Sequence, residues 1–202
     1  MYKVEIENEY KGYKYVVLFT EMGYRCGYVG VKNDNPLYGH SINEKLECLR
    51  KTDLGDQDLG KRNTMLILFE DDPSDDKTSP QIYFDVHGSL TYAKGEPNYP
   101  VASDLWWYGF ECNHHGDRSD PDKAFEYGLF SKSILEIMKN DFFFSKDEQI
   151  ASMEYVEQEC MYLIDQMLRL DLKVKLTLLD KLVANFTKLF QQETGSENNK
   201  YD

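Results

Sequence analysis

The spacing of apolar residues changes once along the chain, near Asp120–Pro121, and this change constrains the fold most. Before it, short aromatic or β-branched segments alternate with Gly, Pro, Asn and Asp, which predicts strands. After it, apolar residues recur at helical spacing. Strands followed by helices predict an α+β fold, an antiparallel β-sheet domain followed by a C-terminal helical hairpin. The strands are expected at residues 14–19, 24–31, 64–69, 81–87, 90–93 and 105–110.

The remaining segments complete this organisation. A short helix is expected around Ile42–Arg50 and a solvated loop at 70–80, where acidic residues, Ser and Pro accumulate. Three regions follow from the pattern. Residues 1–125 form a β-rich domain that carries the site, 126–193 form a helical C-terminal region, and 194–202 form a flexible tail.

The helical hairpin is predicted from two apolar stripes. One helix is expected from about Asp147 to Leu170, and a second has apolar residues in alternating steps of four and three, which marks one continuous stripe. The first helix is strongly acidic and the second is basic, so they are expected to pair. Pairing of 172–190 with another subunit, as a homo-oligomer, is the alternative. The stripe of the second helix consists of Leu172, Leu176, Leu179, Val183, Phe186 and Phe190.

Composition limits the partners. The formal net charge of −13 repels phosphate backbones and anionic lipid, so nucleic acid and membrane surfaces are disfavoured and a cationic protein partner is compatible. The four cysteines are not closely paired, the N-terminus has no apolar signal segment, and no apolar run approaches the roughly 20 residues of a membrane span. A cytoplasmic location with reduced thiols is expected.

The twelve residues from Trp106 to Asp117 form the densest cluster of reactive side chains. They include two tryptophans, two histidines and two carboxylates, and such residues are expected to form one wall of a ligand pocket. Alternation along 82–87 would place His87 on a polar face at a strand end, where Gly88 allows a turn. The residues with site chemistry in the cluster are Trp106, Trp107, Glu111, Cys112, His114, His115 and Asp117.

Two kinds of chemistry fit these residues. In the first, His87 and His114 with Asp117 or Glu111 act as catalytic groups, and His87, His114 and Asp117 bind a divalent metal such as zinc or manganese. Cys112 is a third candidate, as a nucleophile paired with His114, although a buried inert thiol is favoured.

In the second, the same groups bind a polar ligand. Arg25 would clamp phosphate or carboxylate, with Tyr24, Trp106 and Trp107 as further ligand-binding residues. Against these readings, a lone histidine often only hydrogen-bonds a carbonyl, and an arginine often forms a plain surface salt bridge. The sequence contains no Gly-rich phosphate loop, GxSxG elbow or HExxH helix.

Four segments resemble a family of uncharacterised proteins found in phages, prophages and bacterial genomes. They are Gly23–Val29, Asn35–Gly39, Val86–Tyr92 and Trp106–Asp117, and the family typically reads GYxCGYV, HPLYG, VHGGLTY and WWFGFDCAHAGD at these points. The resemblance covers about the first 120 residues and continues weakly at 155–160. His87, Cys112, His114 and Asp117 fit the motifs, while Ser89, Glu111 and Asn113 depart from them.

This resemblance implies a shared site and a phage-type origin, in the cytoplasm of a bacterial host cell, but no reaction. The leading hypothesis is a phage-type accessory protein that binds a small polar or nucleotide-like ligand, with hydrolysis of that ligand left open. One alternative is a metal-dependent hydrolase with a divalent metal as cofactor. The other is an acidic, host-directed inhibitor of the counter-defence type, which acts by contact with a host protein.

Overall fold

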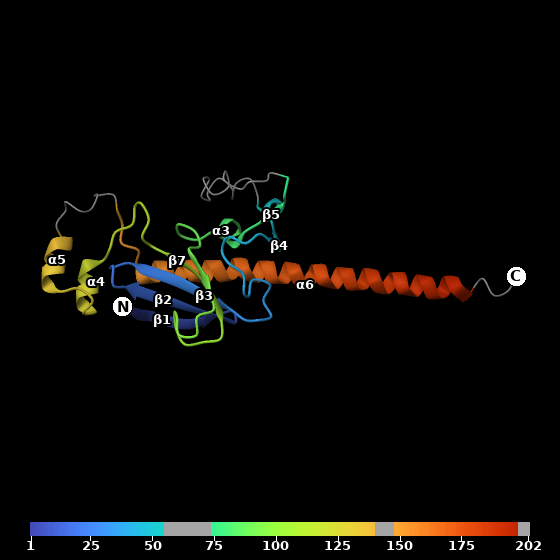
Figure 1. The fold of residues 1–202 in the computed structure, drawn as a ribbon, viewed down its shortest axis with the longest axis horizontal. Coiled ribbons are helices and arrows are strands. Elements are labelled where there is room, and N and C mark those ends of the chain that lie inside the picture. The colour runs from blue at the N-terminus through green and yellow to red at the C-terminus, as the bar shows by residue number, and fades with distance from the viewer. Residues whose placement is uncertain (55–73, 140–147, 198–202) are drawn as a thin grey trace.

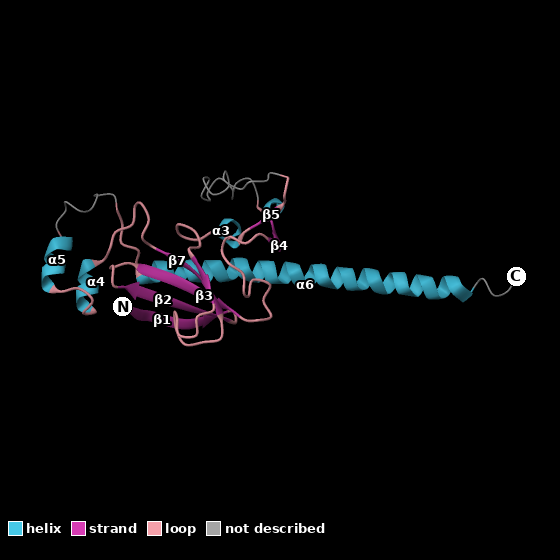
Figure 2. Cartoon of the chain, viewed as in Figure 1, coloured by secondary structure: helices cyan, strands magenta, loops and turns pink. Residues whose placement is uncertain are grey.

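A computed structural model of the chain describes residues 1–54, 74–139 and 148–197, with side chains to residue 188 (Figure 1). Five antiparallel strands form the main sheet in the order β1-β2-β3-β7-β6, and two more form a small sheet. A long helix follows, so the prediction of an α+β fold with an antiparallel sheet is confirmed (Figure 2). The strands are β1 (Tyr2–Tyr10), β2 (Tyr13–Thr20), β3 (Arg25–Val31), β4 (Leu46–Arg50), β5 (Lys77–Thr78), β6 (Tyr92–Lys94) and β7 (Trp106–Glu111), and the helices are η1 (Lys51–Asp53), α3 (Pro80–Tyr83), α4 (Pro121–Glu126), α5 (Lys132–Met138) and α6 (Met153–Glu197).

Helix α6 covers one face of the main sheet with its first half and then continues past the body of the protein (Figure 1). The helix can approach β3 closely because Gly27 has no side chain. A Cβ there would lie 2.4 Å from the Phe110 ring and 2.7 Å from the Cys160 sulfur. The core between helix and sheet is made mainly of apolar side chains, and this packing holds α6 against β3 and β2. The helix contributes Val156, Cys160, Leu163, Ile164, Met167 and Leu170 to this core.

The opposite face of the sheet is covered by the chain that precedes β7. Alternation along the strands directs Tyr28 and Trp107 to this face. Trp107 is completely buried there, and its indole N–H donates to the Ser103 hydroxyl. Tyr99, Val101 and Leu105 close this second, smaller core.

Strands β2, β3 and β7 match the predicted segments within one residue at each end, and β6 overlaps the predicted 90–93. Strand β1 was not predicted, because its many acidic side chains hide the alternation of an edge strand. The predicted strand at 64–69 and residues 70–73 of the predicted loop lie outside the described residues, while Lys77–Thr78 of that loop form β5.

Three predictions of secondary structure are wrong. Residues 46–50 are strand β4 rather than a helix, because they pair with β5 while Leu46 and Leu49 are buried. Residues 81–87 are not a strand, because Pro80 lacks an N–H for a ladder and starts helix α3 instead.

The helical hairpin is also wrong, because α6 is a single helix of 45 residues. Its sequence has no glycine or proline between Met153 and Thr194, so nothing interrupts it near residue 171. The helix continues into the predicted tail as far as Glu197, and residues 198–202 lie outside the described part. The division at residue 125 stays a prediction.

Candidate metal and ligand site

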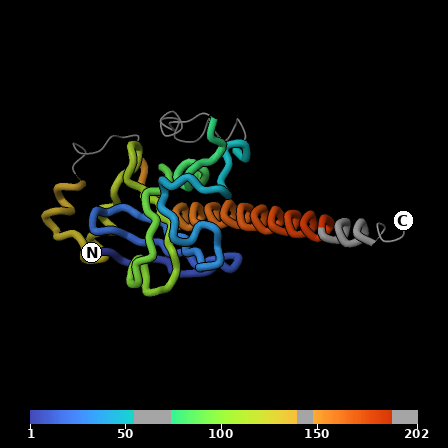
Figure 3. Tube along the Cα trace, turned by 45° about the vertical axis from the view of Figure 1, so that its right-hand side comes forward, coloured from blue at the N-terminus to red at the C-terminus, as the bar shows by residue number. Residues whose placement is uncertain are grey.

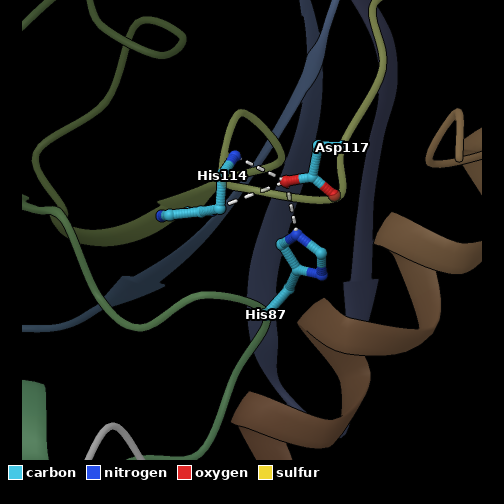
Figure 4. A group of neighbouring side chains, drawn as sticks. All are labelled: His87, His114 and Asp117. Atoms are coloured by element: carbon cyan, nitrogen blue, oxygen red, sulfur yellow. Dashed lines mark hydrogen bonds and ion pairs between the residues drawn. The ribbon is translucent and has the colours of Figure 1, made fainter. Parts of the chain in front are cut away.

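Three loops and one helix meet at the end of the sheet where β7 finishes. His87 lies in the extended segment after α3, and His114 and Asp117 lie in the turn that follows β7 (Figure 4). Tyr155 and Glu159 reach the same place from successive turns of α6. The site therefore depends on the packing of α6 against the sheet.

One carboxylate oxygen organises the cluster. Oδ2 of Asp117 lies 2.8 Å from Nε2 of His87, accepts the backbone N–H of His114 at 2.7 Å, and lies 3.6 Å from Nδ1 of His114 (Figure 4). One ligand atom from each of the three residues lies within 4.8 Å of the others. The Asp117 side chain is only 11% exposed, so water screens this arrangement weakly.

His87 is held from three sides. Its backbone N–H donates to Oε2 of Glu159 at 2.8 Å, and its Nδ1 lies 3.0 Å from the Tyr155 hydroxyl. Burial, followed by the charge of Glu159, raises the pKa of Tyr155 to about 12, so this hydroxyl keeps its proton at neutral pH. Burial also raises the pKa of Glu159, and the hydrogen bond from His87 opposes that rise. The imidazole thus has a fixed orientation toward Asp117.

The turn that carries His114 and Asp117 is anchored from outside. The Asp117 N–H donates to the His114 carbonyl, and Gly116 adopts a φ of +99° that favours glycine. Gln149 pairs with Asp117 as an isolated parallel bridge, donating to the Gly116 carbonyl and accepting from the Arg118 N–H. The segment before α6 therefore holds the turn in place.

His114 packs directly over Gly88. A Cβ at Gly88 would lie 2.1 Å from Cε1 of His114, and the φ of Gly88 is +67°. Only glycine permits both this backbone conformation and this contact. The close approach brings the His114 ring to the same carboxylate as His87, with their ring centroids 5.7 Å apart.

Nδ1 of His114 is buried and has no hydrogen-bond partner in the described structure. A buried nitrogen without a partner is costly unless something else binds it. Two imidazoles and one carboxylate suit zinc, manganese or iron. The donor set therefore fits a divalent metal ion.

An open pocket of about 500 Å³ adjoins this cluster. Its lining includes His87, His115, Asp117, Gln149 and Tyr155. The residues described as lining it include no lysine or arginine. An anionic ligand in this pocket would need another source of positive charge.

Several predicted site residues lie elsewhere. Glu111 is on the face of the sheet opposite to Cys112, because side chains alternate along β7. Cys112 is buried in the core, and burial raises the pKa of its thiol, so a nucleophilic role is disfavoured. Tyr24 packs in the second core, next to Glu111 and Asn113.

Trp106 and Trp107 do not wall this site. They lie at the start of β7, roughly 17 Å (Trp106) and 14 Å (Trp107) from Glu111 along the strand. The Trp106 indole N–H donates to the His40 carbonyl, and Trp107 is in the second core. Their apolar bulk belongs to the packing of the sheet.

Arg25 is buried and cannot clamp a ligand in this arrangement. It forms two hydrogen bonds with Glu5, at 2.7 and 3.0 Å, and donates to the Ala151 carbonyl at 2.8 Å. Glu5 stands at the irregularity in the β1–β2 register, between Val4 and Ile6, and its side chain is only 1% exposed. The pair joins β1, β3 and the segment before α6.

Sequence reasoning missed Tyr155, Glu159 and Gln149. Tyr155 and Glu159 are four residues apart, which places them on one side of α6 next to its buried stripe. That spacing is a usable signal, but it does not say which part of the sheet the helix covers.

Comparison with known protein families, with curated proteins and with solved structures found no match to this chain. No helix among the described residues combines the length and the apolar character that crossing a membrane requires.

Proposed function

We propose that the chain is a phage-type accessory protein that works in the cytoplasm of a bacterial host cell. It binds a divalent metal ion through His87, His114 and Asp117, and it binds and hydrolyses a small polar, nucleotide-like ligand in the adjoining pocket. The observation that carries the proposal is the convergence of two imidazoles and one carboxylate on a point beside an open pocket.

The charge of the surroundings supports a metal ion. The chain carries a net charge of −13, and the described lining of the pocket includes no lysine or arginine. A phosphate or carboxylate ligand would be repelled unless a cation neutralised it. A bound divalent ion supplies that charge and the Lewis acidity that hydrolysis requires.

The protein residues have separate roles in this scheme. His87, His114 and Asp117 hold the ion, and Glu159 and Tyr155 fix the orientation of His87 through its backbone N–H and its Nδ1. The protonated Tyr155 hydroxyl, at the pocket edge, is also placed to donate a hydrogen bond to the ligand. Tyr155 is thus expected to affect ligand binding more than metal binding.

A hydrolysis assay with nucleoside triphosphates and Mn²⁺ or Zn²⁺ tests the reaction. Release of phosphate should require the metal and should be lost in Asp117→Asn, which keeps the size of the side chain and removes its charge. Tyr155→Phe should raise KM with a smaller effect on metal affinity. Metal-dependent ligand binding without turnover would limit the function to binding, and turnover retained in Asp117→Asn would refute the assignment of the site.

A further inference from the structure

The second half of α6 presents an apolar stripe that nothing in the described structure covers. Beyond Leu170 the helix continues for 27 residues, about 40 Å. Lys173 and Val174 still contact the body of the protein, and the far part of the helix extends past it (Figures 1 and 3). Leu178 and Leu182 are more than half exposed beside the stripe, and the five large side chains that form the stripe are also each more than half exposed. They are Leu172, Leu176, Leu179, Val183 and Phe186, in alternating steps of four and three.

This spacing is that of a coiled coil. A repeat of 3.5 residues keeps one apolar stripe directed at a partner helix, with Leu176 and Val183 at position a and the other three at position d. A single exposed leucine needs no explanation, but a continuous stripe on an isolated helix does. The stripe predicts a helical partner.

The stripe lies on the side of α6 that faces away from the sheet. At 100° per residue, its centre is about 150° from the centre of the buried stripe that runs from Val156 to Leu170. Val174, which continues the buried stripe, still packs against the core, whereas Leu172 does not. A partner helix could therefore bind along the stripe without displacing the sheet.

The first half of the helix limits the length of the contact. On the side of the first half of α6 that lies in line with the stripe, Glu154, Gln158 and Arg169 are exposed and polar. The pairing surface therefore starts near Leu172.

We propose that this surface binds the same surface of a second copy of the chain, as a parallel coiled coil. In a parallel pair, position g of one helix faces position e five residues further along the other. Lys175 is at position g and Asp180 at position e, so two opposite-charge pairs would form in the dimer, in exchange for the contact that Lys175 makes with Asp171 of its own helix. In an antiparallel pair with full overlap of the stripe, Asp180 would face its own copy, which disfavours that orientation.

The molecular mass of the full chain, measured by sedimentation equilibrium between 1 and 100 µM, tests self-association. The wild type should be a reversible oligomer. Leu179→Glu should raise the dissociation constant by roughly 100-fold or more, since each copy loses one buried leucine. The matched control is Leu178→Glu, because Leu178 is equally exposed, at 55%, but lies off the stripe. This control should associate like the wild type.

Orientation is tested by charge reversal and by cross-linking. Asp180→Lys should weaken association, and addition of Lys175→Asp should restore it. Phe186→Cys should form a reducible dimer, because like positions meet in a parallel pair. The wild type, with its four native cysteines, measures the background. If Phe186→Cys forms an oligomer but no disulfide cross-link, the parallel arrangement is refuted.

A wild type that remains monomeric at 100 µM would overturn the proposal. The stripe would then be a candidate surface for a host protein, as the inhibitor hypothesis requires. Neither outcome depends on the metal site, because Leu179 and Asp180 lie on the part of α6 that has left the sheet.

Discussion

The buried pair of Arg25 and Glu5 should be a major determinant of stability. Glu5→Leu leaves the guanidinium buried without its main partner, and loss of one member of a buried pair costs about 3–5 kcal/mol. Asp120, at 3.7 Å, and the Ala151 carbonyl remain near the guanidinium, so we expect the lower end of this range, about 3 kcal/mol. For a chain of this size, that corresponds to a fall in Tm of about 6–12 °C.

Urea denaturation followed by circular dichroism measures this loss. The double variant Glu5→Leu with Arg25→Met should recover part of the lost stability, because no buried charge is then left without a partner. Glu47→Gln, which breaks an exposed ion pair with Lys77, is the control and should leave the midpoint unchanged. A loss below about 1 kcal/mol in Glu5→Leu would refute the buried pair and make Arg25 a ligand-binding candidate again.

Three further outcomes follow from the same structure. Gly88→Ala should abolish metal binding, because its Cβ would collide with His114. The control Gly39→Ala, at a φ of +84° and with no neighbour within 4 Å, should lose stability but keep metal binding. Equal metal affinity in the two variants would contradict the contact between Gly88 and His114. Burial raises the pKa of Tyr15 to about 12, so as the pH rises the unfolded chain loses the Tyr15 proton before the folded protein does. The contribution of Tyr15 to the free energy of unfolding should therefore be complete below pH 10 and lost as the pH rises toward 12. Tyr15→Phe should remove the corresponding part of the fall in Tm at alkaline pH. Cys112 should react with iodoacetamide only after unfolding, since burial raises its thiol pKa, and rapid labelling of the native protein at Cys112 would contradict its position in the core.

Residue type and alternation along the chain predicted the strands whose structure does not depend on knowing their neighbours. Strands β2, β3 and β7 are rich in aromatic and β-branched residues, and their alternation or apolar continuity identifies them without knowledge of the neighbours. The segment at Leu46–Arg50 was predicted wrongly because two leucines three residues apart fit one side of a helix, while pairing with β5 decides the structure.

The end of a helix proved harder to predict than its existence. The two apolar stripes predicted two separate helices, but the backbone continues through residue 171 and the two stripes lie on different sides of one helix. A stripe that moves around a continuous helix indicates a change of partner rather than a loop. The opposite net charges of 147–170 and 171–192 are equally ambiguous, because they do not show whether the two segments lie side by side or follow one another along one helix.

The site was predicted in part. His87, His114 and Asp117 meet, although the strand assumed for 81–87 does not exist, because their convergence depends on Gly88 and the turn after β7. The ligand-binding role expected for Arg25 failed because nothing local indicates that Glu5, twenty residues earlier, is directed inward by the irregular register of β1.

Direct titration of the metal-free protein with Mn²⁺ and Zn²⁺ by calorimetry tests the central claim. We expect one ion per chain in the wild type, and loss of binding in His87→Ala, His114→Ala and Asp117→Asn. His115→Ala is the matched control, because His115 is adjacent in sequence and lines the same pocket but is outside the three-residue cluster, so it should bind the metal like the wild type. Absence of binding to the wild type at millimolar metal, or an equal loss in His115→Ala, would contradict the account.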